Sequence, residues 1–206
     1  RDADEVYNAL IPKLRDKKLV TYGIRRDATI TPVTFPFKTS LPGVFNQYNC
    51  LAAVAAATAL NIDSKVIRKS IQMFEGIVGR MEVVQAKPFT VIVDFAHTPN
   101  ALENVLHTVR RMTKKRLIHV FGSAGLRDRT KRPLMGAASS EYADISVLTE
   151  EDYRTEDVND IIEQIAQGIP VGKQVERIPN RAEAVAYALK TAKPGDLVIL
   201  TGKGHE

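Results

Sequence analysis

The chain has 206 residues, of which 44% are hydrophobic, so it can bury a sizeable core and suits one domain of ordinary size plus part of another. Its formal net charge of +5 is compatible with a nucleic-acid binder, but no long basic tail or aromatic stacking pattern accompanies that charge, so we expect no nucleic-acid partner. The absence of an apolar segment of about 18 residues and of a signal peptide predicts a cytoplasmic protein without membrane insertion.

The first part of the chain predicts an incomplete structural unit. Prolines and short β-prone pieces at residues 19–22 and 28–34 favour small strands joined by turns. The apolar stretch 46–61 predicts a helix that is buried on most sides. It contains Cys50, a small core residue with no second cysteine for a disulfide. Such a helix needs packing partners, and the residues before it supply few.

A boundary is predicted next. A second helix is expected over residues 64–74, and Gly76 and Gly79 then indicate a hinge. We therefore divide the chain into residues 1–77 and 78–206. Because residue 1 opens directly into a helical pattern and Glu206 follows Gly-Lys-Gly-His without a closing element, we expect a fragment of a longer protein.

Beyond the boundary, short apolar stretches alternate with helical ones. This alternation predicts an α/β fold, with a Rossmann-like, mostly parallel sheet and right-handed crossovers. The predicted strands cover residues 90–95, 116–121, 144–149 and 197–201. The predicted helices cover residues 99–112, 131–142, 158–167 and 181–191.

Charged or glycine-rich segments follow the ends of the predicted strands. In open sheets of this kind, ligands bind beyond the carboxyl ends of the strands. One shared crevice therefore explains the four segments, which are residues 94–99, 122–129, 149–154 and 202–206.

The first of these segments carries Asp94 and His97. An Asp here could accept hydrogen bonds from ribose hydroxyls, and His97 could orient a group or move a proton near neutral pH. The alternative interpretation is a helix cap followed by a solvated histidine.

The other segments predict a pocket with charges of both signs. Small residues and cations around Arg127 suit a phosphate or a carboxylate. Arg154 follows three acidic residues, and Glu206 closes a Gly-x-Gly turn. Together these charges fit the ammonium and carboxylate groups of an amino acid, whereas salt-bridged surface loops are the alternative. Zinc spacing and a phosphate loop are absent from the sequence, so we expect no metal ligands within it.

Taken in order, these segments resemble the Mur ligase family, most closely the members that add the third residue of the peptidoglycan precursor. The resemblance covers residues 41–206. Its motifs are Leu-Pro-Gly-Val-Phe-Asn-Gln-Tyr-Asn from Leu41, Gly-Arg-Met-Glu from Gly79, Asp-Phe-Ala-His-Thr-Pro from Asp94, Arg-Asp-Arg-Thr-Lys-Arg-Pro-Leu-Met-Gly from Arg127, and Gly-Lys-Gly-His-Glu from Gly202.

The resemblance implies an ATP-dependent ligase that forms an amide bond. Residues 1–77 would be the end of a central P-loop ATPase-type domain, without the P-loop, and residues 78–206 would be the carboxy-terminal amino-acid-binding domain. The implied cofactors are ATP and Mg²⁺, with the metal ligands upstream of this chain. The implied partners are UDP-N-acetylmuramoyl-dipeptide and a diamino acid, meso-diaminopimelate or L-lysine, and we expect a monomer.

The resemblance also implies roles for single residues. Asn46 and Asn49 fall where the family contacts adenine, and Arg80 and Asp94 fall where it contacts ribose and phosphate. His97 lies in the family's Asp-Tyr-Ala-His signature and is the candidate catalytic residue. The residues that would hold the amino acid are Arg127, Asp152, Arg154, Gly202 and Glu206.

This sequence departs from the family pattern within the amino-acid site. The family's Asp-Asn-Pro-Arg reads Glu151-Asp152-Tyr153-Arg154 here, Leu126 replaces an Asp, and Phe95 replaces a Tyr. A carboxylate in place of the amide favours a distal ammonium over a distal carboxylate, whereas Arg154 favours the carboxylate. Three alternatives stay open: a folylpolyglutamate-type ligase, a cyanophycin-type ligase, and a non-catalytic module that binds a nucleotide or an amino acid.

Overall fold

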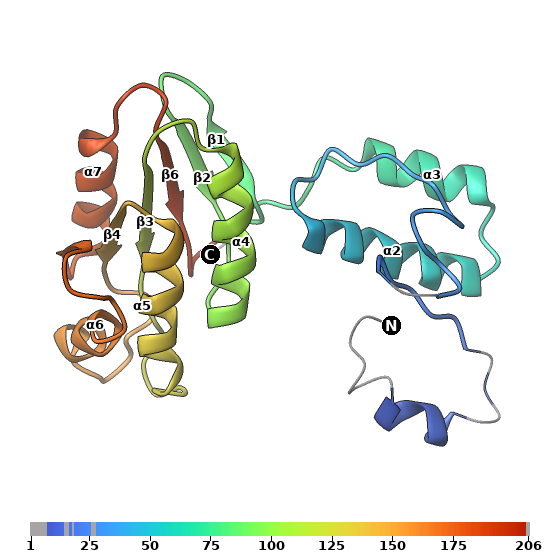
Figure 1. Ribbon diagram of the computed structural model, residues 1–206, viewed down its shortest axis with the longest axis horizontal. Coiled ribbons are helices and arrows are strands. Elements are labelled where there is room, and N and C mark those ends of the chain that lie inside the picture. The colour runs from blue at the N-terminus through green and yellow to red at the C-terminus, as the bar shows by residue number, and fades with distance from the viewer. Residues whose placement is uncertain (1–7, 15–16, 18, 26–27, 205–206) are drawn as a thin grey trace. The chain divides into compact units, whose positions relative to one another are not determined.

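The computed structural model describes residues 8–14, 17, 19–25 and 28–204. The chain divides into two compact units, Arg1–Glu75 and Gly76–Glu206 (Figure 1).

Over the residues that the structure describes, the first unit consists of a short 3₁₀ helix, two α-helices and a long irregular segment. Its elements are the 3₁₀ helix η1 (Ile11–Lys13), α2 (Val44–Ala59) and α3 (Ser64–Met73). The Asp63 side chain caps α3 by accepting from the backbone N–H of Lys65 at 2.8 Å. Both predicted helices are confirmed. The predicted small strands are wrong over the described residues, where Tyr22 and Ile30 form only an isolated bridge.

Within this unit, the first of these helices is buried along one side only. Its buried residues form one stripe, Cys50, Leu51, Val54 and Ala55. Of these, Leu51, Val54 and Ala55 pack with Ile30, Phe35 and Ile67. At the two ends of the helix, Val44 and Leu60 are 50% and 74% exposed. Alanine favours helices on any face, so an apolar composition rich in alanine does not mark which face is buried.

The second unit is a sheet of six strands with helices on both faces (Figure 1). Its strands are β1 (Glu82–Gln85), β2 (Thr90–Val93), β3 (Leu117–Phe121), β4 (Ile145–Leu148), β5 (Gln174–Arg177) and β6 (Leu197–Leu200). Their order is β1-β2-β6-β3-β4-β5, and only β1 runs antiparallel to its neighbour. The predicted mostly parallel α/β fold is confirmed. The sequence missed β1 and β5 because these edge strands carry polar residues and lack an apolar run.

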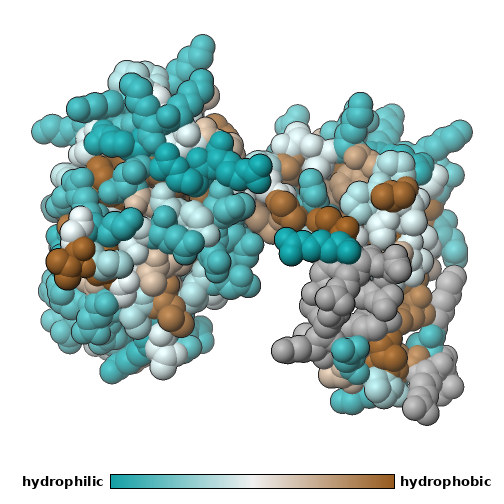
Figure 2. Space-filling view, in the orientation of Figure 1, coloured by the Kyte–Doolittle hydropathy of each residue, from teal (hydrophilic) through white to brown (hydrophobic). Residues whose placement is uncertain are grey.

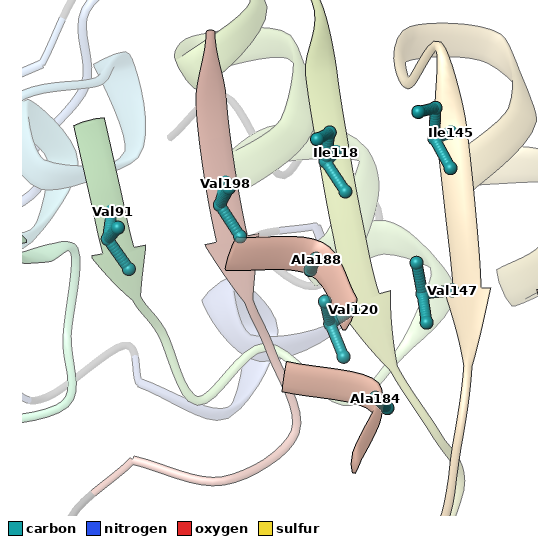
Figure 3. Close-up of a cluster of buried hydrophobic side chains, with 8 residues drawn as sticks. All are labelled: Val91, Ile118, Val120, Ile145, Val147, Ala184, Ala188 and Val198. Atoms are coloured by element: carbon teal, nitrogen blue, oxygen red, sulfur yellow. The ribbon is translucent and has the colours of Figure 1, made fainter. Parts of the chain in front are cut away.

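One face of the sheet is an apolar layer covered by α7 (Arg181–Thr191). Val91, Val198, Ile118 and Ile145 form a row across β2, β6, β3 and β4, because each pairs with the next in register. Ala184 and Ala188 of α7 pack on this layer (Figure 3). Their small side chains let the helix approach the strands closely.

The opposite face is covered by α4 (Pro99–Met112), α5 (Lys131–Tyr142) and α6 (Val158–Ala166). This face contains a polar group at its centre, because His119 is fully buried in the middle of β3. The ring nitrogens of His119 lie 2.8 Å from Ser139 Oγ and 2.9 Å from Thr201 Oγ1. Burial lowers the pKa of His119 to about 3, and the positive charge of Arg181 adds to the shift. The ring is therefore neutral at physiological pH.

The carboxyl ends of β2, β6, β3 and β4 lie side by side at one edge, because these neighbouring strands are all parallel. The segments that follow them are thereby brought together. On the face shown in Figure 2, the surface of the second unit is mostly hydrophilic, with isolated hydrophobic residues. Among the helices that the structure describes, none combines the length and apolar character that a membrane span requires.

The buried neutral His119 predicts an acid-sensitive fold. In the unfolded chain the imidazole binds a proton below its ordinary pKa of 6.5, whereas the folded chain resists protonation down to about 3. The contribution of the neutral ring to the free energy of unfolding is therefore fully present above pH 6.5, and it is lost as the pH falls toward 3. Between pH 7.5 and 5, His119→Phe should lose about 2 kcal/mol less unfolding free energy than the unmodified chain. Urea unfolding at the two pH values measures this difference, and equal losses would contradict the buried neutral ring.

Candidate functional site

A cavity of about 790 Å³ opens beyond the carboxyl ends of the strands in the second unit. Charged side chains of both signs line it. The lining residues are Phe95, His97, Thr98, Ala124, Arg127, Asp128, Lys131, Glu151, Asp152, Tyr153, Arg154 and Lys203. The cavity therefore brings together the predicted site residues His97, Arg127, Asp152 and Arg154, which come from three different strand ends.

The basic run that follows β3 divides into two pairs. Arg127 and Lys131 line the cavity. Arg129 and Arg132 instead form ion pairs with Glu156, at 3.2 and 3.0 Å. Arg132 is fully buried, and it also donates to the carbonyl of Ala124 at 3.2 Å. Half of the cations in this run thus support the loop, and the other half face the ligand space.

Glu156 links the segment after β3 to the segment after β4. Its carboxylate accepts from both terminal nitrogens of Arg132, at 3.0 and 3.1 Å, and from the backbone N–H of Leu126 at 2.5 Å. The Arg132 hydrogen bond and, after it, the Leu126 N–H lower the pKa of Glu156 to about 2. The carboxylate is therefore ionised throughout the neutral range, and it sits next to the loop that carries Arg127.

The two segments also touch through their backbones. Gly125 donates its N–H to the carbonyl of Asp152 at 2.8 Å. A Cβ atom at Gly125 would lie 2.1 Å from the carbonyl oxygen of Tyr153, so only glycine permits this approach. Leu126 and Arg154, on either side of the contact, both have a φ of 53°. Such left-handed conformations are costly for side-chain-bearing residues and gather at binding sites.

The acidic segment after β4 is only partly directed at the cavity. Asp152 Oδ2 lies 3.3 Å from Arg154 Nε. Two of the predicted amino-acid-binding residues therefore form a salt bridge with each other, as the alternative interpretation of these segments expected. Glu150 turns elsewhere and accepts from the backbone N–H of Arg181 at 3.2 Å. The predicted pocket of mixed sign therefore uses Glu151, Asp152 and Arg154, without Glu150.

His97 has a defined tautomer. Its Nδ1 lies 3.0 Å from the carbonyl oxygen of Phe95. A carbonyl only accepts hydrogen bonds, so Nδ1 carries the proton and Nε2 of the neutral ring keeps a lone pair. The backbone carbonyl of His97 in turn accepts from Lys131 Nζ at 3.0 Å. The alternative of Asp94 as helix cap is wrong, because Thr98 caps α4 by accepting from Ala101 N–H at 3.3 Å.

Asp94 and Arg80 lie just outside the cavity lining. The two oxygens of Asp94 accept from the backbone N–H groups of Met81 and Ala96, at 2.8 and 2.7 Å. Burial raises the pKa of Asp94, and these hydrogen bonds and Arg80 oppose the rise. The guanidinium carbon of Arg80 lies 4.2 Å from the centroid of the Phe95 ring. Arg80 therefore makes a cation–π contact with Phe95.

The remaining predicted residues fall in different places. Gly202 has a φ of 93° and lies next to Glu151 of the cavity wall. Asn46 and Asn49 lie in α2 of the first unit, where Asn49 Nδ2 donates to Asn46 Oδ1 at 3.2 Å. Glu206 lies outside the described residues. Within the ranges that the structure describes, no cluster of His, Cys, Asp or Glu side chains could hold a metal ion.

Sequence reasoning missed three functional candidates. Lys131 and Lys203 line the cavity, although each stood inside a motif quoted for other residues. The sequence of the basic run 127–132 does not indicate which of its cations face the cavity. Glu156 was missed because it lies just beyond the charged segment 149–154, and only its contacts with Arg132 and Leu126 distinguish it.

Comparison with known proteins identifies the family. The family model described as "Mur ligase, glutamate ligase domain" matches residues 79–204. This chain belongs to the Mur ligase family. The match covers the whole sheet and the segments that line the cavity, so the site described above lies in the family's glutamate ligase domain.

Curated Mur ligases match the chain along its length. It is 41% identical to "UDP-N-acetylmuramoyl-L-alanyl-D-glutamate--2,6-diaminopimelate ligase" of Alkaliphilus metalliredigens, over 98% of this chain and 46% of that protein. It is 39% identical to the ligase of the same name from Aquifex aeolicus, over 100% of this chain and 46% of that protein. The chain thus spans less than half the length of these relatives.

Solved structures agree with this assignment. A ligase structure of the same name superimposes with a TM-score of 0.62 at 32% identity, over 99% of this chain and 46% of the other. A pseudomurein peptide ligase type C from Methanothermus fervidus gives a TM-score of 0.67 at 26% identity, over 81% of this chain and 35% of the other. A folylpolyglutamate synthase of Mycobacterium tuberculosis gives 0.66 at 20% identity, over 81% of this chain and 39% of the other, which shows a shared Mur ligase fold alone.

The contacts of Glu156 predict that its replacement lowers the thermal stability more than the replacement of a surface glutamate does. Glu156→Gln leaves the buried Arg132 without a charged partner, so the midpoint of thermal unfolding at pH 7 should fall by about 5 °C or more. Glu163→Gln is the matched control, because Glu163 pairs with Arg177 at the surface and its loss should shift the midpoint by about 2 °C at most.

The effect at Glu156 has a pH signature. Because its folded pKa is depressed to about 2, its contribution is present above the ordinary value of 4.5 and is lost as the pH falls toward 2. Circular dichroism melts at several pH values measure the gap between unmodified and Glu156→Gln chains, which should narrow in acid. Equal, small shifts for both glutamates would show that Glu156 does not hold the loops together.

Proposed function

We propose that this chain is the carboxy-terminal part of an ATP-dependent ligase that joins a diamino acid to UDP-N-acetylmuramoyl-L-alanyl-D-glutamate. The observation that carries the proposal is the cavity beyond β3 and β4, in which Arg127, Asp152 and Arg154 lie together. The names of the relatives supply the reaction and one acceptor, diaminopimelate. L-lysine is the other acceptor that the charges of the cavity would accommodate.

The charges of the cavity support an amino acid as ligand. Arg127 offers an exposed guanidinium, and Arg154 uses Nε for Asp152, which leaves its terminal nitrogens for a carboxylate. Asp152 and Glu151 offer negative charge to an ammonium group. An amide at position 152 would donate to a distal carboxylate, whereas Asp152 repels it. Lysine and diaminopimelate therefore compete closely, and Arg154 favours diaminopimelate.

The proposal assigns the two units different tasks. Residues 1–77 would be the end of the central ATPase domain and residues 78–206 the amino-acid-binding domain, with the P-loop and the Mg²⁺ ligands outside this chain. Asn46 and Asn49 would contact adenine, and exposed Asn49 has the amide that a base edge requires. Arg80 and Asp94 would contact ribose and phosphate, since the exposed Arg80 lies over the Phe95 ring, which is part of the cavity lining.

The reaction would proceed in two steps. A carboxylate oxygen of the precursor attacks the terminal phosphorus of ATP, which gives an acyl phosphate and ADP. The amine nitrogen of the bound amino acid then attacks the carbonyl carbon, the bond from that carbon to the phosphate oxygen breaks, and the nitrogen loses a proton. The lone pair on His97 Nε2 is suited to accept this proton, and the ammonium group of Lys131 is suited to offset phosphate charge.

Phosphate release tests this function. The full-length ligase that contains this chain is assayed with ATP, Mg²⁺ and UDP-N-acetylmuramoyl-L-alanyl-D-glutamate, with diaminopimelate, lysine, ornithine or no amino acid. One diamino acid should stimulate phosphate release and appear in the tripeptide product. The 206-residue chain by itself should release none, because the P-loop would lie outside it. No stimulation by any amino acid, or turnover by the chain alone, would refute the proposal.

A further inference from the structure

A chain of buried polar groups crosses the face of the sheet that α4, α5 and α6 cover. It ends beside the cavity. Its centre is His119, whose ring bridges Ser139 Oγ at 2.8 Å and Thr201 Oγ1 at 2.9 Å. Ser139 Oγ lies a further 2.7 Å from Ser146 Oγ on the neighbouring strand. Burying such a set costs desolvation that an apolar layer would avoid, and a fully paired set fixes its members in place.

The ring of His119 is held in one orientation. It stacks on Phe121, with centroids 4.2 Å apart and planes 3° from parallel. In the neutral ring one nitrogen donates and the other accepts, and each faces a hydroxyl that can take the complementary part. Both hydrogen bonds of the ring are therefore made without a charge in the core.

Thr201 is fixed at three points. Its side chain meets His119, its backbone N–H donates to the carbonyl of Val120 at 2.9 Å, and its carbonyl accepts from Arg181 at 2.9 Å. Gly202 follows directly and turns the chain with a φ of 93°, and Lys203 then lines the cavity. The position of Lys203 therefore depends on the position of Thr201.

We propose that His119 is a positioning residue for the amino-acid site, acting through Thr201 on the Gly202–Lys203 segment. This inference rests on the proposed function, because it assigns the segment to the wall against which the diamino acid binds. His119 itself touches no ligand. The hydrogen bond between His119 and Thr201 sets the rotamer and position of Thr201. It thereby sets the direction in which the chain leaves β6.

The polar chain has two halves, one from His119 to Ser139 and Ser146 and the other from His119 to Thr201. Comparing them distinguishes a positioning role from a purely structural one. Ser139 lies within α5, and Ser146 lies five residues before Glu151, the first residue after β4 that lines the cavity. Thr201, by contrast, lies only two residues before the cavity residue Lys203. Loss of the serine half should therefore lower stability alone, whereas loss of the Thr201 half should change the amino-acid site as well.

The test measures KM for the diamino acid, KM for ATP and kcat in the full-length ligase. The variants are His119→Phe, which keeps the stacking and loses both hydrogen bonds, Thr201→Val, and the double variant. Each single variant should raise KM for the diamino acid about fivefold and leave KM for ATP unchanged. The double variant should be no worse than either single variant, because both remove the same bond. Ser146→Ala, the control, should lower the unfolding midpoint without changing either KM.

Several results would overturn the inference. Independent, multiplicative effects of His119→Phe and Thr201→Val would mean that His119 does not act through Thr201. A rise in both KM values, or an equal rise in Ser146→Ala, would reduce the cluster to a structural role. Thr201→Val alone decides the matter if His119→Phe does not fold. Failure of the proposed function would show separately, as an unmodified ligase that no diamino acid stimulates.

Discussion

A buried guanidinium needs a carboxylate, and the shape of the cavity depends on how this need is met. Arg132 has no exposed surface, and it is neutralised by Glu156, which belongs to the segment after the next strand. The same carboxylate accepts from the backbone of Leu126, directly before Arg127. One ion pair thus ties the loop that carries Arg127 to the loop that carries Arg154. Since a buried charge without its partner is costly, the two loops keep their relative place.

The parallel sheet supplies the rest of the arrangement. Strands β2, β6, β3 and β4 end at one edge, so residues far apart in the sequence meet there. Gly125 lets the two loops touch through their backbones, and a close approach of Gly79 to Gly204 fixes the segment after β6. The cavity is therefore lined by loops whose bases are rigid. The proposed binding of an amino acid would benefit from this preorganisation, because holding two reactants in the right geometry lowers the barrier to their reaction.

The sequence predicted the fold well where hydrophobic periodicity was strong and poorly where burial depends on tertiary context. Helix α4 was placed to the residue because Pro99 and an apolar stripe mark it, whereas the polar edge strand β5 was missed. Of the predicted site residues that the structure describes, four line one cavity, but their spacing did not distinguish Arg127, which faces it, from Arg129, which pairs with Glu156. Neither His119 nor Glu156 could be recognised, since each acts through contacts between elements distant in the chain.

We propose that the cavity beyond β3 and β4 holds the incoming amino acid, and the decisive measurement is the KM for the diamino acid in two arginine variants of the full-length ligase. Arg127 lines the cavity, whereas Arg129, two residues later in the same loop, pairs with Glu156 and does not line it. Arg127→Ala should raise this KM by about tenfold or more, through the loss of a charge-assisted hydrogen bond, and Arg129→Ala should leave it nearly unchanged. Equal effects of the two substitutions, or no effect of Arg127→Ala, would show that the amino acid does not bind in this cavity.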